Sequence, residues 1–136
     1  MLRTACALAL LATCAFAARS AAACEYAQGT RVVMAGGQID PNVFVWDTKQ
    51  SAIDYAAGAW KSAREVMVHT RLVGPGTRAT VVACVPEAIK PRYSERVEDA
   101  IGLRVLDGPN RGRYGWAYAE DVHPDVKATR ARAARL

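Results

Sequence analysis

An alternation of apolar and small or polar positions near the C-terminus predicts a β-hairpin. Ile101, Leu103 and Val105 are separated by Gly and Arg, which is the two-residue period of a half-buried strand. Residues 107–112, DGPNRG, are mostly turn formers, so the chain is expected to reverse there. Residues 114–118, YGWAY, then place three aromatic side chains on one strand face and two small residues on the other. We expect another backbone to approach the face with the small residues.

Further strands are predicted on both sides of the hairpin. The β-prone runs occupy residues 29–35, 43–46, 66–72 and 76–85, and a tight turn at 119–122 leads into a last short strand ending at Pro124. Because two strands alone are not stable in water, we expect these runs to complete one sheet with the hairpin.

Between the second and third of these runs the apolar period changes to that of a helix. Apolar residues recur every three or four positions from Ile53 to Met67, with polar residues between them. Asp47, three residues before a Gln, has the spacing of a capping box, so the helix is expected to begin near Thr48. The pattern predicts one amphipathic helix of about 17 residues lying on the sheet, weakened by roughly 1 kcal/mol at Gly58.

The stretch from Pro86 to Ala100 is polar and is predicted to be a surface loop. Proline cannot donate a ladder hydrogen bond, so Pro86 is expected to end the preceding strand. Connections of this length often carry binding residues, because a rigid scaffold holds them at the surface.

The N-terminus has the three regions of a secretory signal peptide, residues 1–23. A short basic start precedes an apolar run at 4–18, and small residues follow up to Ala23. The apolar run is too short to span a bilayer comfortably. We expect cleavage after Ala23, with an earlier alternative after Ala17, and a periplasmic or secreted mature protein.

The cysteines that remain after cleavage suggest an oxidising compartment. Removing residues 1–23 takes away Cys6 and Cys14 and leaves Cys24 and Cys84. A disulfide between these two would close a loop of about 60 residues and contribute on the order of 4 kcal/mol. Two alternatives stay open, namely acylation of Cys24 as a lipoprotein cysteine and a pair of free thiols.

The positive charge of the chain belongs to its C-terminal tail. The formal net charge is +5, and it falls to +3 when the leader with its two arginines is removed. Residues 24–126 carry 12 basic and 13 acidic side chains, a balance of −1, so the body offers no basic face for nucleic acid. The basic tail, 125–136, is expected to be a frayed solvated helix or a weak electrostatic contact with the anionic envelope.

The segment 43–122 resembles the bacterial SH3-like small β-barrel. Three pieces carry the resemblance: the strand that opens with Gly76, the strand 103–106, and the step GRYGWA at 112–117 followed by Glu-Asp-Val at 120–122. The resemblance implies a mainly β fold, an SH3-like barrel of five to six antiparallel strands with one amphipathic helix packed on it. It would make residues 24–124 a single exported domain that binds peptides, glycans or proteins without catalysis.

Catalytic and metal sites find little support in the sequence. His69 and His123 are the candidate bases, and neither lies in a recognisable motif with a nucleophile and an acid. His69 is expected instead to be a partly buried histidine on a strand. Cys84 with either histidine is the basis of a third-ranked hypothesis, a cysteine-based enzyme. No Cys or His spacing suits a metal site, and we expect no cofactor.

Aromatic and arginine side chains near the hairpin are the predicted ligand contacts, because such residues dominate binding hot spots. They are Tyr93, Arg111, Arg113, Tyr114 and Trp116. The ligand is expected between the 86–100 loop and the 107–114 turn. For Trp116 the alternative is a core position, which is also expected for Phe44 and Trp60.

The leading hypothesis for function is an exported, non-catalytic binding module of the bacterial envelope, with an envelope polymer, a peptide or an exported protein as its ligand. The alternative is a small inhibitor or stabilising partner of another exported protein. The ligand and the oligomeric state are left open by the sequence.

Overall fold

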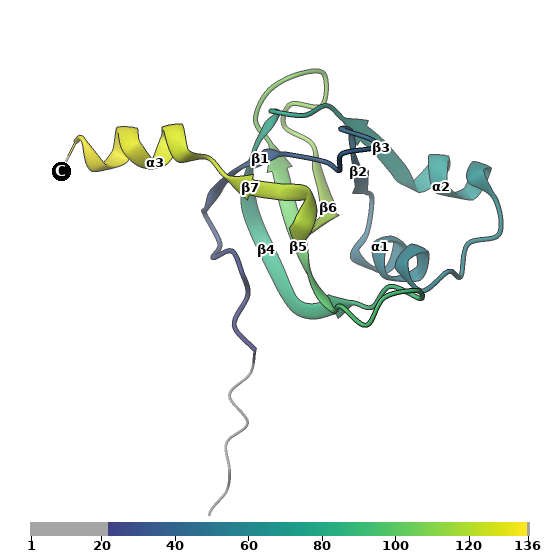
Figure 1. Ribbon diagram of the computed structural model, residues 1–136. Helices are drawn as coiled ribbons and strands as arrows, with labels where there is room; N and C mark the ends of the chain where they lie inside the picture. Colours follow the sequence, from purple (N-terminus) through teal and green to yellow (C-terminus); the bar gives the residue numbers. More distant parts are fainter. Residues whose placement is uncertain (1–21, 136) are drawn as a thin grey trace, which may run out of the picture.

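The computed structural model describes residues 22–135 and has a mainly β fold (Figure 1). Seven antiparallel strands form one sheet in the order β3-β2-β6-β5-β4-β1-β7, which curls into a half-barrel. The strands are β1 (Arg31–Met34), β2 (Val43–Trp46), β3 (Thr70–Val73), β4 (Arg78–Ile89), β5 (Glu98–Val105), β6 (Tyr114–Tyr118) and β7 (Val122–Pro124). The helices are α1 (Lys49–Ala56), α2 (Ala63–His69), α3 (Val126–Ala133) and the 3-10 turn η1 (Ala119–Asp121). The predicted mainly β class is confirmed, whereas the SH3-like identity stays a prediction.

The predicted hairpin is present as the pair β5–β6. Ala100 lies opposite Tyr118 at one end of the ladder, and Arg104 lies opposite Tyr114 at the other. The expected close approach is at Gly115, where an added Cβ would overlap the Val45 side chain and lie 2.8 Å from the carbonyl oxygen of Trp46. Glycine at this position therefore lets β2 lie against β6.

The prediction of one long helix is wrong, because the segment forms two short helices. Thr48 is the N-cap of α1, and its hydroxyl accepts a hydrogen bond from the Ser51 N–H. Gly58 adopts φ +72°, a left-handed conformation that cannot continue a helix. Ser62 then caps α2 by accepting from the Glu65 N–H, so a second helix begins where the first pattern was expected to run on.

The strand expected at 66–72 is also largely wrong. Helix α2 continues to His69, and only Thr70–Val73 is extended. The alternating residues Val66 and Thr70 are also four apart, the helical spacing, and the Thr70 hydroxyl donates to the Val66 carbonyl. The Ser62 cap favours the helical period over the strand period, because the Ser62 hydroxyl accepts from a backbone N–H that would otherwise be unpaired at the helix N-terminus.

Strand β4 is longer than expected and passes through Pro86 to Ile89. The ladder with β5 shifts register between Val85 and Ile89, and Glu87 in this irregular stretch has φ +51°. A bulge of this kind tolerates the missing N–H of proline. The expected loop 86–100 is therefore shortened to residues 90–97, which we call the β4–β5 loop.

Two clusters of buried side chains hold the sheet. The first lies inside the curl and includes Met34, Val45, Leu103 and Ala117. The second lies between the sheet and α1, with Trp46, Ala52, Ile89 and Ala100 at its centre. Phe44 and Trp116 pack against the second cluster, whereas Trp60 is half-buried in the linker between α1 and α2.

The two ends of the described chain differ in how they are held. The predicted disulfide between Cys24 and Cys84 is confirmed and ties the N-terminal segment to β4. The predicted signal peptide, except for its last two residues, lies outside the described residues. The basic tail forms α3, an exposed helix that projects from the half-barrel (Figure 1). None of the helices within residues 22–135 is long and apolar enough to cross a membrane.

Candidate functional site

Two clefts lie on either side of the β4–β5 loop and share the side chain of Glu120. The first, the aromatic cleft, has a volume of about 460 Å³ and is lined by Tyr55, Trp60, Arg92, Tyr93, Tyr118 and Glu120. The second, the acidic cleft, has a volume of about 470 Å³ and is lined by the carboxylates of Glu25, Glu87, Glu98, Asp99 and Glu120. Arg96 and His123 also line it. The two clefts place aromatic and acidic surfaces next to each other at one end of the sheet.

The outer wall of the aromatic cleft comes from the β4–β5 loop. Tyr93 is 90% exposed, and the Arg92 guanidinium carbon lies 5.5 Å from the centre of its ring. The Arg92 N–H donates to the Ala56 carbonyl over 2.8 Å, which ties the loop to the last residue of α1. An exposed ring on a tethered loop can contact a ligand with little loss of conformational freedom.

The inner wall of the aromatic cleft is formed by buried or half-buried rings. The Tyr118 hydroxyl donates to the Ala52 carbonyl over 3.1 Å, and burial raises the pKa of Tyr118. Trp60 packs edge-on against Trp46 at 5.9 Å and against His69 at 4.8 Å between ring centres. These contacts fix the orientation of the rings that face the cleft.

The acidic cleft contains a buried carboxyl group. Glu98, the first residue of β5, is 8% exposed, and no hydrogen-bond donor within residues 22–135 reaches its buried Oε2 atom. Burial raises the pKa of Glu98 to about 7, with a further contribution from the charge of Glu120 and the hydrogen bond between the two side chains. Burial and Glu120 likewise raise the pKa of Asp121 to about 6. Glu98 is therefore the carboxyl group of this cleft that gains or loses its proton near neutral pH.

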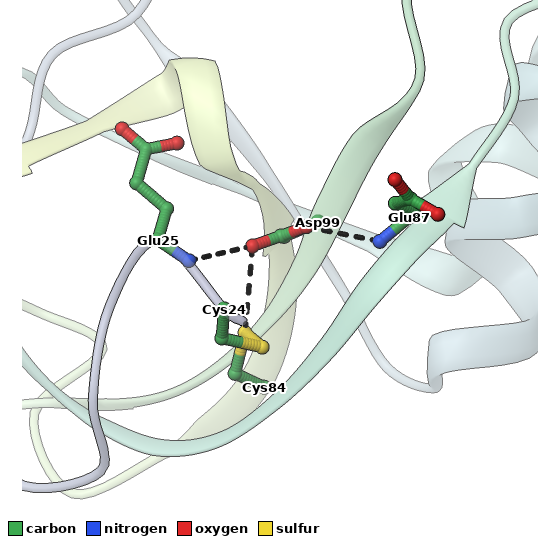
Figure 2. The surroundings of a disulfide bond; sticks show 5 residues. All are labelled: Cys24, Glu25, Cys84, Glu87 and Asp99. Carbon is green, nitrogen blue, oxygen red and sulfur yellow. Dashed lines mark hydrogen bonds between the residues drawn. A yellow bond between two sulfur atoms is a disulfide. The ribbon is translucent and has the colours of Figure 1, made fainter. Parts of the chain in front are cut away.

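The back of the acidic cleft is fastened by the disulfide and by Asp99 (Figure 2). The Asp99 carboxylate accepts from the Glu25 N–H over 2.7 Å and from the Glu87 N–H over 2.9 Å. The bridged sulfur of Cys84 lies 3.8 Å from the same carboxylate. Asp99 thus joins three segments, namely the N-terminal segment, the β4 bulge and the start of β5. Its two oxygens already have donors, which leaves the side chains of Glu25, Glu87, Glu98 and Glu120 as the other carboxyl groups of the cleft.

The geometry offers little to a metal ion. Within the described residues the one set of three potential ligands that converges is Cys24, Cys84 and Asp99. Its two sulfurs are joined to each other in the disulfide. A bridged sulfur is not a thiolate, so this set lacks the ligands that zinc requires.

The structure does not bring the five predicted contact residues together. Tyr93 lies at the end of the β5–β6 ladder where Ala100 pairs with Tyr118, whereas Tyr114 lies at the opposite end with Arg104. Arg111 and Arg113 are exposed in the turn beside Tyr114, and Trp116 packs against the second core cluster between the two ends. Ligand contact at these residues stays a prediction, but one ligand between the loop and the turn would have to span the ladder.

The structure shows the surroundings of the two histidines and of Cys84. His69 is the last residue of α2 and does not lie on a strand, which corrects the sequence prediction. Its Nδ1 lies 2.7 Å from Asp47 Oδ2. His123 lines the acidic cleft. The Cys84 sulfur is bonded to Cys24 and has no thiolate in this form.

Apart from Tyr93, sequence reasoning missed the residues that build the two clefts. Glu98 carried one usable signal, because in a strand it shares a face with Ala100 and so places a carboxyl group on a buried surface. Tyr55 and Trp60 were hidden, because a continuous helix would have placed Trp60 on its packed face. Only the break at Gly58 leaves Trp60 in a linker, where it lines the aromatic cleft.

No family model matches this chain, and neither curated proteins nor solved structures include a match to it. The disulfide suggests a location outside the cytoplasm.

Proposed function

We propose that the protein is an exported, non-catalytic binding module of the bacterial envelope, and that its ligand, a peptide or glycan of the envelope polymer, lies in the aromatic cleft. The observation that carries the proposal is the exposed Tyr93 ring facing a cleft whose other wall holds Tyr55, Trp60 and Tyr118. Aromatic faces bind sugar rings and extended peptides through large contact areas, and Arg92 and Glu120 supply polar contacts at the edge.

The experiment compares two exposed tyrosines at opposite ends of the same hairpin. Tyr93→Ala removes a ring from the aromatic cleft, and Tyr114→Ala removes a ring that is 60% exposed at the distant turn. Co-sedimentation with purified insoluble envelope material is measured for the wild type and both variants. We expect Tyr93→Ala to weaken binding by about tenfold, as at a hot spot, and Tyr114→Ala to change it less than twofold.

Two results would contradict the proposal. Unchanged binding in Tyr93→Ala would exclude the aromatic cleft as the ligand site. A loss of binding confined to Tyr114→Ala would place the ligand at the turn. Circular dichroism and thermal unfolding of both variants verify that each is folded, which is expected because both rings are largely exposed.

A stabilising or inhibitory role toward another exported protein has its own support. Strand β3 is at an edge of the sheet, and the adjoining Met67, Val68 and Leu72 are 76%, 71% and 57% exposed. Unpaired strand edges and exposed apolar side chains suit a protein partner. Recovery of one exported protein in stoichiometric amount, without insoluble material, would favour this alternative.

A further inference from the structure

The acidic cleft holds an excess of negative charge that the aromatic cleft does not explain. Five carboxylates line it, and Arg96 is the permanent cation among its lining residues. Asp99 is satisfied by two backbone N–H groups, so its charge is structural. The remaining acids line the cleft, and Glu98 does so as a residue that is 8% exposed and whose Oε2 atom is buried.

Glu98 is the buried carboxyl group of this cleft, and one of its oxygens has no hydrogen-bond partner. No N–H or O–H donor among residues 22–135 reaches Oε2 of Glu98, and the neighbour it faces is another carboxyl group, Glu120. Two carboxyl groups can satisfy each other only by sharing a proton, and otherwise they need a donor from outside. The Glu120 backbone N–H donates to the Glu98 carboxyl group, but Oε2 has no donor, and a buried carboxylate oxygen without a donor is costly, so the folded chain favours either the proton or an external cation.

The shape of the cleft limits which cation fits. The converging set that a metal ion requires is absent from the described residues apart from the disulfide trio, so a divalent ion is not favoured. The cleft, at about 470 Å³, is larger than one ammonium or guanidinium group. Val97, which is 43% exposed, adds apolar surface to the lining. A side chain with an apolar stem and a cationic head matches this combination.

Beyond the binding module proposed above, we propose that the acidic cleft binds a lysine or arginine side chain of a basic peptide segment, with the carboxyl groups of Glu98 and Glu120 as its acceptors. A guanidinium presents paired N–H donors to carboxylate oxygens, which makes arginine the better fit. The aliphatic stem lies along the apolar lining, and the rest of the peptide stays outside the cleft.

This site is linked to pH, because a cation and a proton compete for the same carboxyl pair. The groups that face or surround Glu98 are Glu120 and Asp121 on η1, Tyr118 on β6, Glu87 on β4, Asp99 on β5, Arg96 in the β4–β5 loop, His123 on β7 and Glu25 in the N-terminal segment. Most are acidic, so above neutral pH their charges add to the attraction for the cation. Below neutral pH the proton on Glu98 removes an acceptor, and binding weakens.

The test uses the full chain, because Ala22 and Ala23 line the cleft, and two synthetic probes, N-acetyl-tri-arginine amide (tri-arginine) and its neutral isostere N-acetyl-tri-citrulline amide (tri-citrulline). Isothermal titration calorimetry at pH 8 is carried out on the wild type, Glu98→Gln and Glu95→Gln. Glu95 is exposed in the same loop, outside the lining of the acidic cleft, and its variant has the same net charge as Glu98→Gln. We expect Glu98→Gln to lose at least about tenfold in affinity for tri-arginine and Glu95→Gln to lose less than twofold.

A second measurement does not depend on the variant folding. Carboxyl carbon NMR follows the titration of Glu98 in the wild type with and without tri-arginine. We expect the midpoint to move to lower pH when the peptide is present, and tri-citrulline to leave it unchanged.

The proposal is overturned by any of three results. They are no saturable binding of tri-arginine by the wild type, equal losses in the two variants, or a Glu98 midpoint that the peptide does not move. Equal losses would mean general attraction to a negative surface. None of these outcomes bears on Tyr93 or on envelope binding, so this proposal and the aromatic cleft can fail separately.

Discussion

Acidic side chains at the two ends of the β5–β6 ladder have different environments, and their pKa values shift in opposite directions. At the turn end, Asp107 lies against Arg78 in an exposed ion pair, and the hydrogen bond from Arg78 lowers the pKa of Asp107. At the loop end, Glu98 is buried against Glu120, and its pKa is raised to about 7. The fold supplies hydrogen-bond donors to Asp107, whereas Oε2 of Glu98 has none and is open to a proton or a ligand.

The comparison separates structural charge from charge that is open to a ligand. Asp107 accepts from both the backbone N–H and the Nε of Arg78, so little of it remains for a partner. Asp99 shows that the loop end also contains a satisfied acid, and Glu98 beside it shows the contrast within two residues. Whether a carboxyl group is open to a ligand therefore depends more on its hydrogen-bond donors than on its position along the hairpin.

The largest expected effect comes from breaking the disulfide that fastens the loop end. The bond closes a sequence separation of 60 residues. Its loss is expected to cost on the order of 4 kcal/mol in the free energy of unfolding, because the unfolded chain regains loop entropy. Denaturant unfolding with and without reductant measures it, and the Cys24→Ser/Cys84→Ser variant, which should not respond to reductant, is the control.

Amide hydrogen exchange after reduction of the disulfide shows which end of the ladder the bond stabilises. After reduction the amide protons of Glu25 and Glu87, both bonded to Asp99, should exchange faster than that of Arg78 at the turn. Equal acceleration at both ends would show that the disulfide does not act locally.

The second effect is a pH dependence that comes from Glu98. A carboxyl group whose pKa rises from 4.5 in the unfolded chain to about 7 in the fold binds its proton more tightly when folded. Stability is therefore expected to fall as pH rises from about 4.5 to 7, by up to about 2 to 3 kcal/mol. Denaturant unfolding across this range should show the decrease in the wild type and a smaller decrease in Glu98→Gln, where Asp121, whose pKa is also raised to about 6, still contributes. A wild-type profile that rises with pH would contradict the assignment.

The smallest effect is expected at the turn end and has the opposite sign. Asp107 has a lowered pKa in the fold, so its contribution is present above the unfolded pKa and is lost as pH falls through the folded value. Asp107→Asn should destabilise slightly at pH 7 and make no difference in strong acid. Added salt should shrink the effect, because the pair is exposed. A stability loss in Asp107→Asn at pH 7 larger than the pH-dependent decrease assigned to Glu98 would contradict this ranking.

The sequence by itself determined those features that depend on neighbours along the chain. The β5–β6 hairpin, the strand 43–46, the turn at 119–121 and the role of Gly115 follow from alternation and turn residues, because local backbone preferences decide them. The disulfide was predictable as well, since only two cysteines remain after the expected cleavage.

Tertiary structure decided most of the rest. The split of 48–69 at Gly58 and the Ser62 cap is local and was missed in the sequence, whereas the passage of β4 through Pro86 depended on a bulge against β5. The clefts exist because residues far apart in the chain, such as Trp60 and Tyr93 or Glu98 and Glu120, meet at one end of the ladder. Burial and the absence of a donor arise only when these residues come together in the fold. No local pattern could therefore reveal that Oε2 of Glu98 has no hydrogen-bond donor.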